Sequence, residues 1–322
     1  MGYQDKITIG IRDSELSKAQ TKEFISFAEK KIKEISKNSF DIKFIKTSGD
    51  INNKERLDKI GGKGLFVKEI EECILSNKVD IGVHSMKDMP AESHKDLEIF
   101  CFMNRLDNSD VLVSNSGKSL SSLDSGSIVG TSSVRRRAQI LNFRKDIDIK
   151  LLRGNVDTRI KKLRNNEYDA IILAHAGLKR LNMENEITEI LSHDYFLPSA
   201  GQGAIGIQSK ANSRFRKIFE NINHKQTEIT IAAERRFLKT IRANCNSPVS
   251  VYAKIENQKL NMQCRIFSHN GELIYDEAMS SLPDEFNSLG IELGNNAIKK
   301  LGQHTIDKLN NLENDFNYTS KR

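Results

Sequence analysis

The 322-residue chain has no tryptophan and only four prolines, and it has no long apolar run. So few prolines leave no room for a long proline-rich linker. A membrane-spanning helix needs about 18 apolar residues, and the best candidate here, residues 170–178, is interrupted by His175. The N-terminus also lacks the apolar core of a secretory signal. We therefore expect a cytoplasmic protein that does not enter a membrane.

Cysteine is also scarce, and its spacing excludes two further classes of protein. No two of the four cysteines form a CxxC pair and no histidines gather near them, so we expect neither a bound metal nor a disulfide framework. Cys73, Cys101 and Cys264 lie in apolar stretches and are expected in the core. Cys245 differs, because it stands in a polar turn (242–248) where its sulfur would be exposed and available for chemistry.

The net charge of +7 favours anionic partners, but it does not choose between nucleic acid, acidic small molecules and plain solubility. No nucleic-acid-binding motif is present, and the aromatic residues are not interleaved with the basic ones, so we expect no nucleic-acid partner. The chain is 38% hydrophobic, which is enough for packed cores, and its length predicts two or three domains.

Strand and helix patterns alternate through the first two thirds of the chain, which predicts parallel sheets covered by helices. The expected strands are 6–12, 41–47, 79–85, 97–103, 110–114, 127–131, 147–152, 169–175 and 204–208. The expected helices are 14–36, 65–76, 132–144, 156–165 and 227–241. Three consecutive strands and a helix then follow (250–256, 260–268, 272–279 and 284–301), which indicate a smaller α+β module.

Two pairs of segments in this α/β region look alike. Residues 9–14 and 129–133 each turn at a glycine from a strand into a serine-capped helix, and residues 77–84 resemble residues 166–173. We interpret this as two similar α/β lobes. Such lobes bind ligands between them, at the carboxyl ends of their strands.

Three arginines follow Ser132 and Ser133 in the first turn of the helix expected over 132–144. The positive end of the helix dipole makes each cation there cost up to about 1 kcal/mol. An anion bound by the arginines and the helix N–H groups would relieve this conflict; alternatively, some of the arginines turn outward into solvent. Further cations stand at the carboxyl ends of strands or in the helix that follows, namely Arg12, Lys87, Arg153 and Arg159. Converging on one cleft, they would suit a ligand with several carboxylates or phosphates.

Two further motifs surround these cations. The glycine-rich residues 61–66, which include Lys63, lack the Walker spacing; they form either a mobile lid with an anion hook or a plain surface loop. Asp88 is a carboxylate in an otherwise cationic strand end. It could accept hydrogen bonds from N–H groups and stabilise a developing cation, or it could simply pair with Lys87 or cap a helix.

Taken together and in this order, these segments resemble the hydroxymethylbilane synthase (porphobilinogen deaminase) family over about residues 6–255. The matching segments are 10–14, 61–66, 80–88, 130–136, 152–159, 168–174, 176–181 and 201–204. The resemblance implies an α/β fold of two lobes like type II periplasmic binding proteins, plus a smaller C-terminal α+β domain. The implied domains are 1–106 with 202–223, 107–201, and 224–322.

The resemblance also implies an activity and a cofactor. The family joins four porphobilinogen molecules head to tail, with loss of ammonia at each step, and then releases hydroxymethylbilane by hydrolysis. The growing chain is held on a dipyrromethane cofactor, attached through a thioether for which Cys245 is the matching residue. No metal is implied, and the protein would act as a monomer with porphobilinogen as its partner.

Residue roles follow from the matching motifs. Asp88 would be the catalytic carboxylate, and it would also bind the cofactor. The other cofactor-binding residues would be Ser14, Lys87, Ser132, Ser133, Arg135 and Arg136. The substrate-binding residues would be Arg12, Lys63, Phe66, Arg153, Arg159 and Gln202. Ala243 and Asn244 depart from the two glycines that usually precede the family's cysteine.

A non-enzymatic, two-lobed protein that binds an organic anion is the alternative, because the fold and the arginines would suit it equally well. Asp88 among the cations, an exposed Cys245 and the lack of a secretion signal speak against it.

Overall fold

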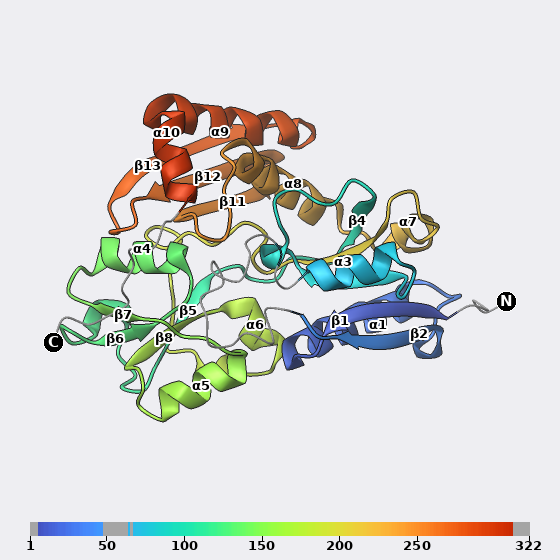
Figure 1. Ribbon diagram of the computed structural model, residues 1–322, viewed down its shortest axis with the longest axis horizontal. Helices are drawn as coiled ribbons and strands as arrows, with labels where there is room; N and C mark the ends of the chain where they lie inside the picture. The colour runs from blue at the N-terminus through green and yellow to red at the C-terminus, as the bar shows by residue number, and fades with distance from the viewer. Residues whose placement is uncertain (1–5, 48–63, 65–66, 312–322) are drawn as a thin grey trace.

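The computed structural model describes residues 6–47, 64 and 67–311, and their strands form three sheets (Figure 1). Lobe 1 contains a five-stranded sheet in the order β2 (Phe40–Ile45), β1 (Ile7–Arg12), β3 (Ile81–Ser85), β10 (Ile205–Lys210), β4 (Leu97–Phe102). Lobe 2 contains another in the order β7 (Asp148–Lys150), β6 (Ile128–Gly130), β8 (Ala170–Ala174), β5 (Asp110–Ser114), β9 (Glu189–Ile190). The third sheet, β11 (Val249–Glu256), β12 (Lys259–Phe267) and β13 (Leu273–Ser281), belongs to what we call the C-terminal module, residues 225–311.

The helices cover these sheets. They are α1 (Glu15–Lys31), α3 (Lys68–Leu75), α4 (Val134–Phe143), α5 (Val156–Arg164), α6 (His175–Arg180), α7 (Phe215–Phe219), α8 (Lys225–Thr240), α9 (Phe286–Leu301) and α10 (Gln303–Asn310). Helix α1 ends at Lys31, five residues earlier than expected, and helices α6, α7 and α10 were not predicted. No helix in the described part of the chain is both long and apolar enough to cross a bilayer.

The two lobes share one topology, which confirms the expected pair of similar lobes and the smaller third unit. The expectation of purely parallel sheets is wrong, because one strand in each lobe runs against its neighbours: β10 in lobe 1 and β5 in lobe 2. Each of these strands follows a crossing between the lobes (residues 103–109 and 198–204) and therefore starts where the parallel strands end.

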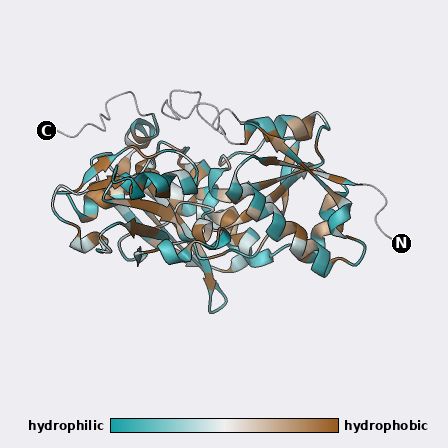
Figure 2. Ribbon diagram, turned by 90° about the horizontal axis from the view of Figure 1, so that it is seen from below, coloured by the Kyte–Doolittle hydropathy of each residue, from teal (hydrophilic) through white to brown (hydrophobic). Residues whose placement is uncertain are grey.

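Each unit has an apolar core of its own, and Figure 2 shows the hydrophobic strands inside the more hydrophilic helices. In lobe 1, Ile9 on β1 and Phe24 on α1 are fully buried, and Phe24 packs against Phe219 with ring centroids 5.3 Å apart. Cys101 and Cys264 are buried as predicted. Cys73 is only half-buried, because it lies at the edge of a small cluster between α3 and the sheet.

The C-terminal module is attached to both crossings through one buried carboxylate. Glu234 on α8 is fully buried and forms an ion pair with Arg105 of the first crossing, with Nη1 and Oε1 2.6 Å apart. Its other oxygen accepts a hydrogen bond from the N–H of Gly201 in the second crossing, at 2.7 Å. The N–H of Ala253 on β11 donates to Oε1 at 2.9 Å. The module is therefore fixed to the hinge region of the two lobes.

We expect Glu234→Gln to lower the free energy of unfolding by about 3–5 kcal/mol, because it removes a fully buried carboxylate and leaves Arg105, whose side chain is only 11% exposed, without its anion. Glu256→Gln is the control: Glu256 pairs with Lys254 at the surface, where a salt bridge contributes about 0–1 kcal/mol. Urea unfolding followed by circular dichroism measures both variants. Equal unfolding midpoints for the two variants would contradict the anchoring role of Glu234.

Candidate active site

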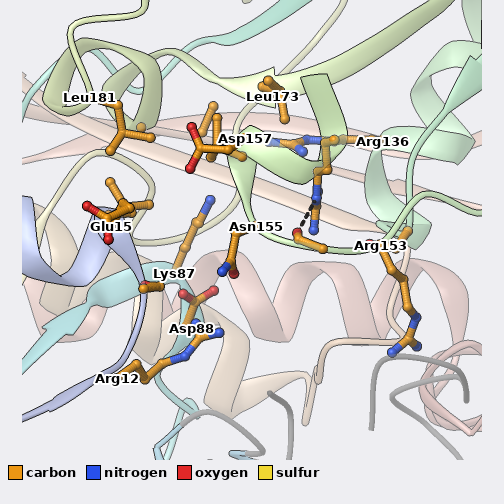
Figure 3. A pocket seen from close by; sticks show the side chains of 18 residues that line it. Arg12, Glu15, Lys87, Asp88, Arg136, Arg153, Asn155, Asp157, Leu173 and Leu181 are labelled. Carbon is orange, nitrogen blue, oxygen red and sulfur yellow. Dashed lines mark hydrogen bonds between the residues drawn. The ribbon is translucent and has the colours of Figure 1, made fainter. Parts of the chain in front are cut away.

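A cavity lies between the two lobes, where β1, β3, β6 and β8 end (Figure 3). Its walls come from both lobes. The residues that line it are Arg12, Ser14, Glu15, Leu16, Lys87, Asp88, Ser132, Arg136, Arg153, Gly154, Asn155, Val156, Asp157, Arg159, Leu173, Ala174, Gly177 and Leu181. The cleft predicted at the carboxyl ends of the strands is therefore present.

The cavity brings together the strand-end cations predicted from the sequence. Arg12 and Lys87 of lobe 1 face Arg136, Arg153 and Arg159 of lobe 2 across it. The pKa of Lys87 is lowered to about 8: desolvation is the main cause, Arg136 and Arg159 add to it, and Asp88 and Asp110 oppose it. Burial likewise lowers the pKa of Arg159 to about 10, and neighbouring arginines add to the effect. Each of these crowded cations disfavours the charged form of its neighbours. The cavity therefore favours a ligand with several negative charges.

Asp88 ends a short 3₁₀ turn after β3, and the second crossing supports that turn. The N–H of Met86 donates to the carbonyl of Ala204 at 3.0 Å. Gly201, at a φ of +73°, lies so close that a Cβ there would come within 2.6 Å of the Met86 carbonyl carbon, so only glycine fits. Figure 3 shows Lys87, Asp88 and Asn155 directed into the space between the lobes.

A carboxylate of the same chain forms ion pairs with the arginine-rich first turn of α4. The carboxylate of Asp110, the first residue of β5, is fully buried. Oδ2 accepts from Arg135 Nη2 at 2.7 Å, and Oδ1 accepts from Arg136 Nη2 at 2.6 Å and from Gln202 Nε2 at 3.0 Å. We expected an external anion or solvent to satisfy the guanidinium groups of Arg135 and Arg136. This expectation is corrected, because Asp110 of the same chain accepts hydrogen bonds from both.

The same contacts set the charge of Asp110. Desolvation alone would raise the pKa of Asp110, but the charges of Arg135 and Arg136 and the hydrogen bonds outweigh it, so that the pKa lies below its ordinary value. Asp110 thus stays ionised and holds the helix that carries two of the predicted ligand-binding arginines.

Several predicted residues lie beside the cavity rather than in its wall. Arg135 is buried and also donates to the carbonyl of Leu197 at 2.6 Å; it is not among the lining residues. Gln202 is 1% exposed and donates to the carbonyl of Asn108 at 2.7 Å, so it joins the two crossings. Ser133 caps α4 and does not line the cavity, whereas Ser132 does. Ser14 both caps α1 and lines the cavity.

Cys245 is exposed, as predicted, in the loop between α8 and β11. It is not among the residues that line the cavity. The left-handed residue of this loop is Arg242, at a φ of +54°, so neither Ala243 nor Asn244 occupies the conformation that glycine favours. Lys63 and Phe66, the predicted loop residues, lie outside the described residues.

Sequence reasoning missed three carboxylates of this region. Asp110 directly precedes the buried apolar run Val111–Val113, and a carboxylate in such a place requires a charged partner, which is a signal that could have identified it. Glu15 and Asp157 line the cavity from the first turns of α1 and α5. Acidic residues are common in first turns for their effect on the helix dipole, so their position gives no sign of a second role.

The chain matches two family models along most of its length. Residues 7–217 match "Porphobilinogen deaminase, dipyromethane cofactor binding domain". Residues 228–299 match "Porphobilinogen deaminase, C-terminal domain". The similarity therefore extends beyond residue 255, where the sequence motifs end.

Individual proteins agree with the family models. The chain is 41% identical over 305 residues to the porphobilinogen deaminase of Bacillus cereus (strain AH820), which covers 94% of this chain and 97% of that protein. It is 37% identical to the porphobilinogen deaminase of Alkaliphilus metalliredigens, with 94% and 96% covered. Substrate binding domain 2 of Lactococcus lactis GlnP in its open conformation overlaps with 69% of this chain and 88% of its own, at 13% identity and a TM-score of 0.38.

The Asp110 cluster predicts how stability depends on pH. Because the pKa of Asp110 is lower in the folded state than the ordinary unfolded value of about 3.9, its stabilisation is complete above that value and is lost as the pH falls through the folded pKa. Asp110→Asn should therefore cost about 3–5 kcal/mol at pH 7, and the difference from the parent should shrink below about pH 4.

Urea unfolding midpoints at pH 7 and in acid measure this dependence on pH. Asp284→Asn, at an exposed carboxylate of the C-terminal module, serves as the control and should change neither midpoint appreciably. A parent–Asp110→Asn difference that is the same at both pH values would show that the Asp110 charge contributes nothing.

Proposed function

The chain belongs to the porphobilinogen deaminase family, and on that premise we propose which of its residues carry the reaction. The family condenses four porphobilinogen molecules into hydroxymethylbilane in tetrapyrrole synthesis, and this chain has the same transferase activity. The non-enzymatic binding protein considered as an alternative is not favoured. The observation that carries the proposal is a single cavity in which cations from both lobes surround Asp88.

The residues of the cavity fit the dipyrromethane cofactor, whose binding domain the chain contains. Each pyrrole of such a molecule carries an acetate and a propionate, so that it requires several cationic partners, and Lys87, Arg136 and Arg159 supply them from opposite walls. Ser14 and Ser132 add hydroxyl groups to these walls. When bound, the cofactor supplies the pyrrole carbon on which the product chain grows.

Cys245 is proposed to hold the cofactor through a thioether. Two observations support this role: its sulfur is exposed, whereas Cys101 and Cys264 are buried, and the loop that carries it is rigidly hydrogen-bonded. Burial raises the pKa of Cys101 to about 12 and that of Cys264 still higher, so neither buried thiol is suited to act as a nucleophile.

Asp88 is proposed as the catalytic residue. Its carboxylate lies in the cavity beside the Lys87 ammonium group, in a wall that is otherwise rich in cations. There it can accept hydrogen bonds from pyrrole N–H groups and stabilise the positive charge that develops on the substrate when ammonia leaves. Arg12, Arg153 and Arg159 are proposed to bind the acetate and propionate groups of incoming porphobilinogen.

Other predicted binders act less directly. The buried contacts of Arg135 and Gln202 favour an indirect role for both, because each donates to Asp110 and thereby holds the arginine helix against the crossings. Direct binding by Arg135 and Gln202, and by Ser133, stays a prediction, as do the roles of Lys63 and Phe66.

We further propose a cytoplasmic monomer that binds no nucleic acid. A cavity whose walls come from one chain, and whose charges suit a small polyacid, supports this reading. The proposed domains are residues 1–106 with 202–223, residues 107–201, and residues 224–322. The distribution of the strands over three sheets supports these boundaries.

Intact mass tests the attachment residue. Protein made in cells that supply porphobilinogen should be heavier than its sequence by one dipyrromethane, and Cys245→Ser should have the mass of the bare chain. Cys73→Ser, at a half-buried helical cysteine, should keep the added mass. An adduct retained by Cys245→Ser would place the attachment elsewhere.

Asp88→Asn keeps the size of the side chain but removes its charge. We expect it to retain the cofactor, as measured by intact mass, and to lose about 10²-fold or more in turnover, since one stabilising group for a developing charge contributes that much. Asp96→Asn, at an exposed carboxylate eight residues further on, should turn over normally. Near-normal turnover by Asp88→Asn would assign the catalytic role to another group.

A further inference from the structure

The loop that carries Cys245 is shaped by hydrogen bonds on both sides of the cysteine. Before it, the N–H of Asn244 donates to Ser247 Oγ at 2.9 Å. After it, the N–H of Asn246 donates to Asn244 Oδ1 at 2.8 Å, and the N–H of Ser247 donates to the carbonyl of Asn244 at 3.1 Å. The result is a tight turn with Cys245 at its tip.

Within the described part of the chain, the side chain of Asn310, at the end of α10, holds this turn from outside. Asn310 Oδ1 accepts from Ser247 Oγ at 2.5 Å, and Asn310 Nδ2 donates to the carbonyl of Ile241 at 2.8 Å. The backbone carbonyl of Asn310 accepts from Asn244 Nδ2 at 3.0 Å. One asparagine therefore ties together the start of the loop, its end and the residue next to the cysteine.

The position of Asn310 is itself fixed by the core of the C-terminal module. Ile306 and Leu309 on α10 are 2% and 8% exposed and pack into that core. Asn310 is 6% exposed, and its amide donates through Nδ2 and accepts through Oδ1. A buried amide that contributes only packing would be more stable as an apolar residue, whereas one with partners on both atoms specifies the geometry of what it contacts.

We propose that Asn310 is a positioning residue for Cys245: through Ser247 and Ile241 it holds the loop in the shape from which the sulfur receives and presents the cofactor. The proposal rests on the assigned role of Cys245 as the attachment residue. It makes α10, at the far end of the chain, part of the apparatus that seats the cofactor.

The neighbouring Asn311 provides a matched control, because it is exposed, whereas Asn310 is buried. The chain's own cysteines provide an internal control. In cofactor-free, full-length protein, hydrogen exchange at the hydrogen-bonded N–H groups of Asn246 and Ser247 reports on the loop, whereas maleimide labelling of the buried Cys101 and Cys264 reports on opening of lobe 1 and of the module core. Peptide mass analysis separates the three rates.

We expect Asn310→Ala to raise the exchange rate of these two N–H groups about fivefold or more, the effect of losing a typical hydrogen bond, while Cys101 and Cys264 stay protected from labelling. Asn311→Ala should leave all three rates unchanged. Ser247→Ala should reproduce the effect of Asn310→Ala. The effect of the double variant should be smaller than the product of the two single effects, because the Ser247–Asn310 bond is broken in both single variants.

The cofactor provides the second readout. Intact mass should show a lower loaded fraction for Asn310→Ala than for Asn311→Ala when both are made with the same supply of porphobilinogen. An unchanged exchange rate at the loop N–H groups would overturn the proposal. So would a rise in the labelling of Cys264 that matches the rise in loop exchange, since Asn310 would then support the module as a whole. A parent protein that carries no adduct would instead refute the attachment role of Cys245, and the exchange result would still stand on its own.

Discussion

The site depends on one buried carboxylate that is shared by two arginines. Asp110 stands at the start of the strand that enters lobe 2, and it forms ion pairs with Arg135 and Arg136 at a helix N-terminus where cations are unfavourable. One net positive charge remains in this cluster. Gln202 of the second crossing donates to the same oxygen as Arg136. The two crossings and the arginine helix are thus joined at a single atom, Oδ1 of Asp110, and this junction places Arg136 at the cavity wall.

This arrangement divides the cations of the site into two groups. Arg135 is satisfied within the protein, so its charge contributes to the framework. Lys87 and Arg159 line the cavity among other cations, and desolvation there, together with the neighbouring positive charges, lowers their pKa values. Such crowding is relieved where a ligand supplies negative charge, as the carboxylates of linked pyrroles would. Under the proposed function, the excess of positive charge in the cavity matches an acidic product chain that gains two carboxylates at each addition.

The sequence predicted those features that local patterns control, and it failed where contacts between distant segments decide. The strand–glycine–serine–helix repeats identified both lobes, and the cations at strand ends converge on the cavity because parallel strands end on one side of a sheet. The antiparallel direction of β5 and β10 was not predicted. Strand direction follows from the crossings and does not change the hydrophobic periodicity of a strand. The partner of the arginines could not be assigned because Asp110 is 25 residues away from Arg135 in the chain.

The C-terminal module is held in position by contacts with the two crossings, with the segment after Asp88 and with α4. Glu234 holds both crossings. Arg235 donates to the carbonyl of Ala91 and to Ser93 in the segment after Asp88, at 3.3 and 3.1 Å. On the side of lobe 2, Gly271 in the β12–β13 turn, at a φ of +87°, lies so close to α4 that a Cβ would come within 2.9 Å of the Ala138 carbonyl oxygen. A module that contacts the crossings, the segment after Asp88 and the arginine helix keeps its cysteine loop in a fixed relation to all three. The proposed attachment point of the cofactor is thereby defined relative to the residues proposed to bind its carboxylates, although they lie on three separate units of the fold.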